Sequence, residues 1–138
     1  MKTTRAGLLL AVGVLAAAVA STPASAHHGT NISYDHANPI TFKARVTEFR
    51  FTNPHVQIFF DVIDDKGTAT PWAGELTSPN NLARNGWTRK RSVAALPPGT
   101  MLTITVFPSK AGAKAGVVSK ILNDKGEQVL LGRDQRVE

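Results

Sequence analysis

Residues 40–55 read ITFKARVTEFRFTNPH, and this stretch decides the fold. Its first half alternates apolar and polar residues, which is the pattern of a half-buried strand. The alternation then shifts by one residue, so that Phe49 and Phe51 are apolar while Glu48 is polar. Such a shift turns a strand over unless one extra residue is inserted. We therefore expect a bulge at Thr47–Glu48 that bends a long first strand.

The next elements make a three-stranded meander. The first strand ends at Asn53-Pro54, because proline has no N–H to donate to a strand ladder. A second strand, predicted over about 55–63, has alternate apolar residues on one face. The turn at 64–67 ends in a glycine that can take a positive φ, and it leads into a third strand over about 69–76.

A short helix separates this meander from the remaining strands. Ser78 fits the N-cap, Pro79 the first helical position and Gly86 the C-terminal stop, so the helix has two turns and offers Leu82 to a core. Residues 87–95 are interpreted as a basic connector, and their WTRKR start as a solvated loop. The further strands are expected at 101–107, 116–122 and 128–131, with a flexible loop at 108–115.

This order of elements favours a small β-barrel of the oligonucleotide/oligosaccharide-binding (OB) type with five or six strands. In such a barrel a bent first strand joins both halves and a helix between the third and fourth strands caps one end. We predict this all-β fold with one short helix, and an open β-sandwich is the alternative. The barrel domain is expected to span 40–132, after a polar arm at 27–39 and before a charged tail at 133–138 that frays.

The first 26 residues have the three parts of a secretory signal peptide. Lys2 and Arg5 precede an uncharged apolar run of about 15 residues, and the small residues Ala24-Ser25-Ala26 follow. The run is shorter than the roughly 20 residues of a spanning helix, although a retained membrane anchor is the alternative. Cleavage after Ala26 predicts a periplasmic or secreted protein without a transmembrane span.

Composition narrows the possible partners and chemistry. The chain has no cysteine, which excludes disulfides, thiolate metal sites and thiol catalysis. Removal of Lys2 and Arg5 with the signal lowers the formal net charge from +6 to +4, which favours anionic surfaces such as lipid headgroups or acidic glycans. Basic residues interleaved with aromatics, as in single-strand binders, are not found, so no nucleic-acid partner is expected.

Several short segments of the chain together resemble one bacterial family. The segments are His27–Gly29, Tyr34-Asp35, Val46–His55, Trp72–Leu76, Ser78–Asn80, Asn85–Thr88, Pro98-Gly99 and Pro108–Lys110. In this order they are similar to a family of short exported proteins catalogued as a domain of unknown function. The resemblance covers most of the chain after the signal and implies no activity. Where that family commonly has tryptophan, this chain has Phe51.

The histidines suggest a metal site. All four lie early in the chain, at His27, His28, His36 and His55. Signal cleavage makes His27 the N-terminal residue, whose amine and ring nitrogen can chelate one ion, and a second imidazole completes a T-shaped site that resembles the histidine brace of copper proteins. Such nitrogen ligands suit Cu(II), with zinc and nickel as alternatives. His55, at the start of a rigid strand, is the predicted second ring, and His28 or His36 is the alternative.

Other polar and aromatic residues complete two competing hypotheses. Asp35 or Glu75 is expected to supply an axial oxygen or to hydrogen-bond a ligand ring. The second hypothesis is a metal-free barrel that binds an envelope glycan, lipid or protein partner. Its face would comprise Phe49, Phe51, Asn53, Trp72, Glu75 and Trp87, although these aromatics also fit a core. A lone Glu75 makes no acid/base pair, so a non-catalytic binding protein is predicted.

Overall fold

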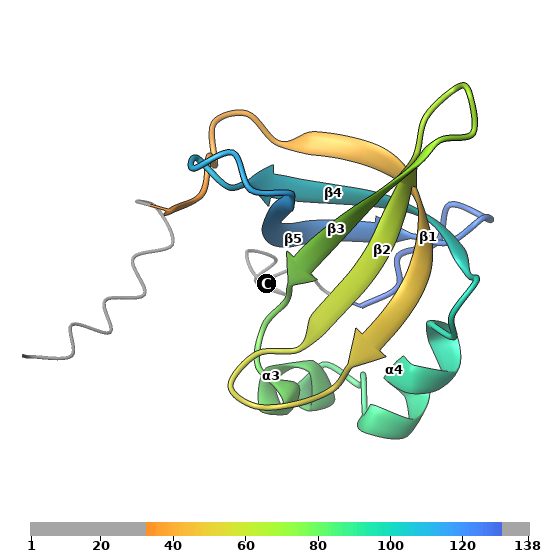
Figure 1. Ribbon diagram of the computed structural model, residues 1–138. Helices are drawn as coiled ribbons and strands as arrows, with labels where there is room; N and C mark the ends of the chain where they lie inside the picture. Colours follow the sequence, from red (N-terminus) through yellow and green to blue (C-terminus); the bar gives the residue numbers. More distant parts are fainter. Residues whose placement is uncertain (1–32, 131–138) are drawn as a thin grey trace, which may run out of the picture.

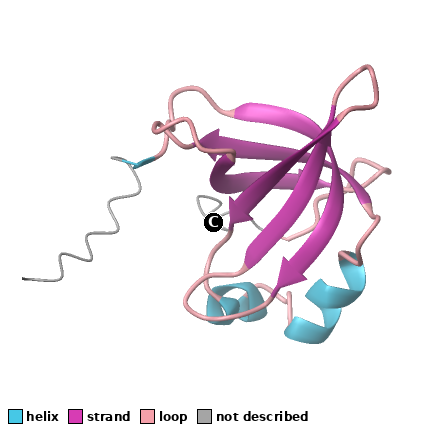
Figure 2. Cartoon of the chain, viewed as in Figure 1, coloured by secondary structure: helices cyan, strands magenta, loops and turns pink. Residues whose placement is uncertain are grey.

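The chain closes on itself through five strands. The structure, a computed structural model, describes residues 33–130. Its strands are β1 (Ile40–Arg50), β2 (Gln57–Ile63), β3 (Ala69–Glu75), β4 (Met101–Pro108) and β5 (Ala115–Leu122). They form a closed barrel in the order β1-β2-β3-β5-β4, antiparallel except for the β3–β5 pair (Figure 1, Figure 2). The predicted small all-β barrel is therefore confirmed, and the open sandwich is not formed.

The bend of β1 has the predicted cause. The β1–β2 register runs regularly to the pair Val46↔Phe60 and resumes at Glu48↔Phe59, so one extra residue stands in β1. This bulge lets one strand pair with β2 over its second half and with β4 over its first half. Ala44 pairs with residues of both neighbours, which places it at the crossing of the two ladders.

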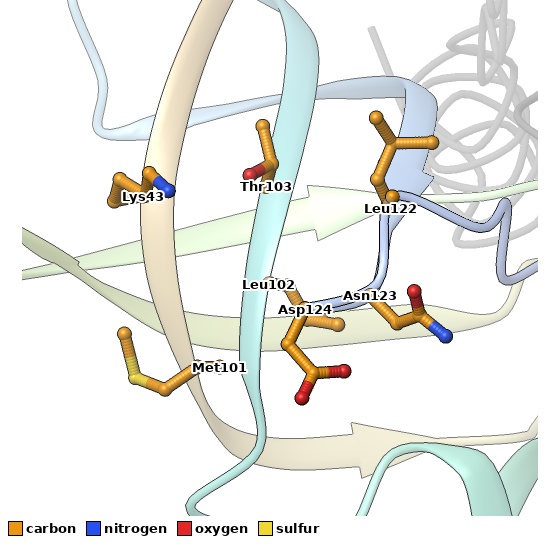
Figure 3. Close-up of a pocket in the computed structure, with 8 residues that line it drawn as sticks. Lys43, Met101, Leu102, Thr103, Leu122, Asn123 and Asp124 are labelled. Carbon is orange, nitrogen blue, oxygen red and sulfur yellow. The ribbon is translucent and has the colours of Figure 1, made fainter.

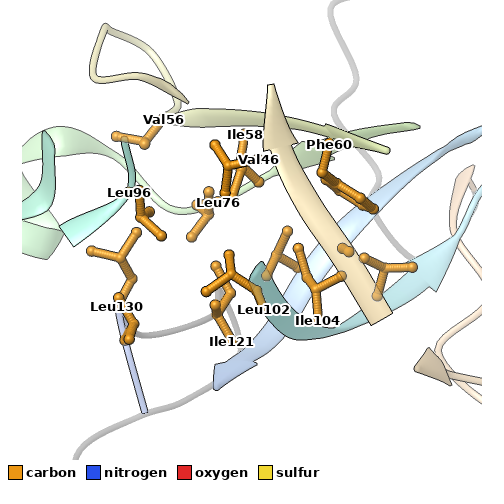
Figure 4. Packing of buried hydrophobic residues seen from close by; sticks show 14 of the residues in the cluster. Val46, Val56, Ile58, Phe60, Leu76, Leu96, Leu102, Ile104, Ile121 and Leu130 are labelled. Atoms are coloured by element: carbon orange, nitrogen blue, oxygen red, sulfur yellow. The ribbon is translucent and has the colours of Figure 1, made fainter. Parts of the chain in front are cut away.

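The barrel interior is filled by buried side chains from four of the five strands, β1, β2, β4 and β5 (Figure 4). The buried strand residues are Ala44, Val46, Ile58, Phe60, Leu102, Ile104, Val106, Val117, Val118 and Ile121. Gly74 faces the same interior, and a Cβ built on it would stand 2.6 Å from Val118 Cγ2 and 2.9 Å from Ile58 Cγ2. Glycine is therefore required where β3 packs this closely.

Two short helices, rather than one, close one end of the barrel (Figure 1). The first, α3 (Pro79–Arg84), begins at the predicted cap, where Ser78 Oγ accepts a hydrogen bond from the backbone N of Asn81 (3.3 Å). Leu82 is fully buried, as its helical position predicted. The helix thus seals the barrel with one large apolar side chain.

The second helix, α4 (Arg89–Ala95), corrects the predicted basic connector and the predicted solvated loop at its start. The sequence concealed it because its first turn carries three cations and no acid, which is unfavourable next to the positive end of the helix dipole. Tertiary contacts stabilise it instead. Ser92 and Leu96, one turn apart, are both buried, and Thr88 caps the first turn.

Smaller differences lie at the ends of the described range. Gln128 forms a single bridge with Leu122 where a sixth strand was predicted. In the segment 108–115, predicted as a flexible loop, Ser109 forms an isolated antiparallel β-bridge with Tyr34. Between residues 33 and 130, no helix is both long and apolar enough to cross a membrane.

Candidate functional site

The candidate site lies at the corner between β1 and β2, which is held by contacts from two distant segments. The peptide bond between Asn53 and Pro54 is cis. The guanidinium of Arg89, at the start of α4, donates a hydrogen bond to the Phe51 carbonyl (2.9 Å). On the other side, the backbone of Val56 bonds to the chain that follows β3, at 2.8 and 3.1 Å. The corner is therefore a fixed platform.

His55 and Glu75 meet on this platform. His55 Nδ1 lies 2.7 Å from Glu75 Oε1, and the two side chains are 26% and 28% exposed. The contact follows from the ladder, because Gln57 pairs directly with Glu75 and His55 stands two residues earlier. In the neutral ring the Nδ1 proton is donated to the carboxylate, so Nε2 keeps the lone pair that can bind a ligand. Histidines that bind metals are commonly oriented by a carboxylate in this way.

Neither His36 nor Asp35 joins this pair. The ring of His36 packs against Phe107, with ring centroids 4.4 Å apart. Asp35 accepts hydrogen bonds from Asn38 Nδ2 (2.9 Å) and from the Ala37 backbone, and the Asn38 side chain is the main cause that lowers the pKa of Asp35. Within residues 33–130, no three His, Asp or Glu side chains are grouped to hold a metal ion. His27 and His28 lie outside the described residues.

The aromatic residues singled out in the sequence do not share one open face. Phe51 is 9% exposed and belongs to the core, whereas Asn53 is exposed at the corner. Trp72 is half-buried, with its ring 4.8 Å from the ring of Phe42. Trp87 is also half-buried, and Arg91 stands 4.1 Å above its ring. Most of this aromatic surface therefore stabilises the barrel and its helices.

A second feature of the outer surface was not assigned from the sequence. Phe59 is half-buried, and the guanidinium of Arg50 stands 4.5 Å from the centre of its ring. Arg50 also binds Glu48 through two hydrogen bonds of 2.6 and 2.9 Å, and the bond from Arg50 holds the pKa of Glu48 below its ordinary value. A hollow of about 410 Å³ opens here, bounded by β1, β2, β3 and Lys114. The sequence signal for this hollow is that Phe59 and Ile63 make the second face of β2 partly apolar.

Comparison with known proteins identifies the family. A sequence model of the family of unknown function DUF6152 matches residues 14–119. The chain belongs to this family. The predicted resemblance to a domain of unknown function is thereby confirmed. No curated protein and no solved structure matches the chain.

This DUF6152 protein has a further hollow of about 300 Å³ over β1, β4 and the turn after β5 (Figure 3). Its rim carries Lys43 and Asp124, with Met101 and Thr103 of β4 between them. None of the residues predicted as a site from the sequence lines it. No titratable pair, ring stack or buried polar group in this hollow indicates a ligand, so the β1–β2 corner remains the leading candidate.

Proposed function

We propose that this protein is an exported, non-catalytic binding protein that holds one copper ion between His55 and an N-terminal His27. The observation that carries the proposal is the 2.7 Å contact between His55 Nδ1 and Glu75 Oε1. It fixes the ring so that Nε2 serves as the ligand atom. The signal-like first 26 residues support export, and cleavage after Ala26 supplies the chelating amine and imidazole.

The ligand chemistry supports copper over harder cations. One amine and two imidazole nitrogens suit the tetragonal geometry of Cu(II), which also has the highest affinity among the divalent first-row metals. His55 is accessible, since its side chain is 26% exposed, yet its backbone is fixed by the corner. A ligand fixed before the ion arrives loses little conformational entropy on binding.

The length of the arm also permits the proposed pairing. Ser33 bonds to Lys110, and the neighbouring Ala115 pairs with Ala73 of β3. From Ser33 to Glu75 this path crosses three strand spacings and runs two residues along β3, a total of roughly 21 Å. His27 lies six positions before Ser33, and six extended residues span up to roughly 22 Å. His27 can therefore reach the His55–Glu75 pair.

The test is copper titration of the exported protein after mass spectrometry has established its N-terminus. We expect near one equivalent of Cu(II) to bind. His55→Ala should weaken binding at least about tenfold, equivalent to about 1.4 kcal/mol. Glu75→Gln should weaken it by roughly tenfold, as removal of a carboxylate that orients a metal-bound histidine does elsewhere.

His36→Ala is the matched control, because it removes a histidine that packs on Phe107 instead. It should leave copper affinity unchanged. A mature N-terminus at any residue other than His27 would contradict the proposal. So would stoichiometric copper binding that survives both the His27 and the His55 substitutions.

The hollow beside Phe59 favours a second candidate function, a metal-free binding site for an acidic envelope glycan. Two cations stand over aromatic rings around it, Arg50 over Phe59 and Lys114 5.6 Å from the centre of Trp72. Rings and cations together can stack on a sugar and neutralise its acid group. Phe59→Ala separates the candidates: it should abolish glycan binding and leave copper binding intact, whereas His55→Ala should do the reverse.

A further inference from the structure

In the part of the chain that carries both helices, all the charged residues are basic. Between Glu75 and Asp124 there are seven lysines and arginines and no acidic residue. Four of these cations, all exposed, lie on or beside the two helices: Arg84, Arg89, Lys90 and Arg91. We call residues 79–95 the helical cap, because α3 and α4 cover one end of the barrel (Figure 1). The helical cap thus carries four cations and no carboxylate.

The outward side of α4 adds an apolar group to these cations. Val93 is 46% exposed and is one of three large hydrophobic side chains exposed in residues 33–130. It stands three positions after Lys90, so the two side chains are neighbours on the helix surface. The opposite side of α4 is anchored in the fold, since Ser92 and Leu96 are buried. Val93 is therefore not one of the buried core residues.

The cap presents both fixed and extended cations. Arg89 is bonded to the Phe51 carbonyl, and Arg91 to the Gly86 carbonyl at 3.1 Å. Within residues 33–130 no hydrogen bond or ion pair holds the side chain of Arg84 or Lys90. These two can extend toward a partner without loss of an internal contact.

We propose that the helical cap docks onto the surface of a bilayer that contains anionic lipids. The cations would neutralise headgroup phosphates, and Val93 would enter the interfacial region between them. A soluble polyanion would use the same cations, but it offers no apolar phase for Val93. The combination of four cations with an exposed valine on α4 is therefore the feature that selects a lipid surface.

Arg89 links the helical cap to the β1–β2 corner, independently of any metal. Arg89 belongs to the cap and is bonded to the corner through Phe51. Docking by the cap would therefore hold the corner, with His55 and Glu75, close to the lipid headgroups.

The experiment is co-sedimentation of the exported protein with vesicles. The vesicles contain phosphatidylcholine alone, or with about 30% phosphatidylglycerol. We expect binding to the anionic vesicles alone, weakened at high salt because surface charge is screened. Lys90→Glu should reduce the partition constant roughly 25-fold, since it changes two charge units and each changes the constant roughly fivefold. Lys66→Glu, the same change in the distant β2–β3 turn, should reduce it at most about threefold.

Val93→Ser separates lipid from other anionic partners. It should weaken binding to vesicles several-fold and leave binding to soluble polyphosphate unchanged. Equal effects of Lys90→Glu and Lys66→Glu would overturn the proposal, because they would indicate attraction by net charge alone. Binding to polyphosphate without binding to anionic vesicles would also overturn it, in favour of a soluble polyanion.

Discussion

The β2–β3 hairpin and the β1–β2 corner are both strand connections, but they are held in different ways. In the hairpin, the Asp64 carboxylate accepts hydrogen bonds from the backbone N of Lys66 (2.9 Å) and of Thr68 (2.7 Å). All its contacts lie within four residues. The corner is held by Arg89, which is 38 positions from Phe51, and its histidine meets a carboxylate 20 positions away. The hairpin is therefore held by local contacts, whereas the corner is held by contacts with residues far away in the sequence.

This difference explains why the candidate binding side chains lie at the corner and not in the hairpin. In the hairpin, the carboxylate of Asp64 accepts hydrogen bonds from backbone N–H groups of the same turn. At the corner, the carboxylate of Glu75 at the end of β3 contacts the ring of His55, which lies in the loop before β2. The two proposed interaction sites, the His55–Glu75 pair and the helical cap, both lie at the end of the barrel that depends on distant contacts.

Among the substitutions that test this comparison, Leu82→Ala should have the largest effect on stability. Leu82 is fully buried where α3 seals the barrel, so its truncation leaves a cavity. We expect a loss of about 2–5 kcal/mol in the free energy of unfolding, measured by urea denaturation. The matched control is Val93→Ala on the exposed side of α4, which should change stability by less than about 0.5 kcal/mol. Similar losses in both variants would mean that the helices do not seal the core.

The same contrast between local and distant contacts explains which elements could be predicted from the sequence and which could not. The bulge at Thr47, the cap at Ser78 and the turn at Asp64 were predicted correctly because their determinants lie within a few residues. Helix α4 was missed because its stabilising contacts, the burial of Ser92 and Leu96, are tertiary. Three adjacent cations at its start read as a solvated loop in the absence of those contacts.

The candidate site was partly visible in the sequence for a related reason. His55 was singled out by residue type and by its place at the start of the second strand, and Glu75 as a carboxylate on the third strand between apolar neighbours. The sequence left open whether Asp35 or Glu75 would contact a histidine ring, because the choice depends on the β2–β3 register, in which Gln57 pairs with Glu75. The packing of His36 on Phe107 was equally hidden, since the arm and the end of β4 are joined only in the fold.

A smaller effect is expected from Arg89→Met. The change keeps the apolar stem and removes the donor to the Phe51 carbonyl. Loss of this long-range hydrogen bond should lower the free energy of unfolding by about 1 kcal/mol. Lys90→Met, the adjacent cation without such a bond, should stay within about 0.5 kcal/mol. If urea denaturation gives the same result for both variants, the corner is held by the ladder bonds of Val56 instead of by α4.

The smallest expected effect concerns Glu48, which pairs with Arg50 beside the corner. The hydrogen bond from Arg50 lowers the pKa of Glu48 below its ordinary value of 4.5. A lowered carboxyl pKa stabilises the fold above the unfolded-state value, and this contribution is lost as the pH falls through the folded-state pKa. Stability should therefore fall more steeply with acid below about pH 4.5 in the wild type than in Glu48→Gln. Because both side chains are exposed, the difference should be slight.

Titration of Glu48 by NMR gives this effect a sharper measurement. In Arg50→Gln the pKa of Glu48 should rise toward its ordinary value. Arg45→Gln is the control, because Arg45 binds Asp61 at 3.1 Å instead, and it should leave the Glu48 titration unchanged. The Glu48–Arg50 pair spans only two positions, so it resembles the hairpin contacts. A rise in the pKa of Glu48 after Leu82→Ala, at a pH where the variant stays folded, would instead show that this pair also depends on the distant helices.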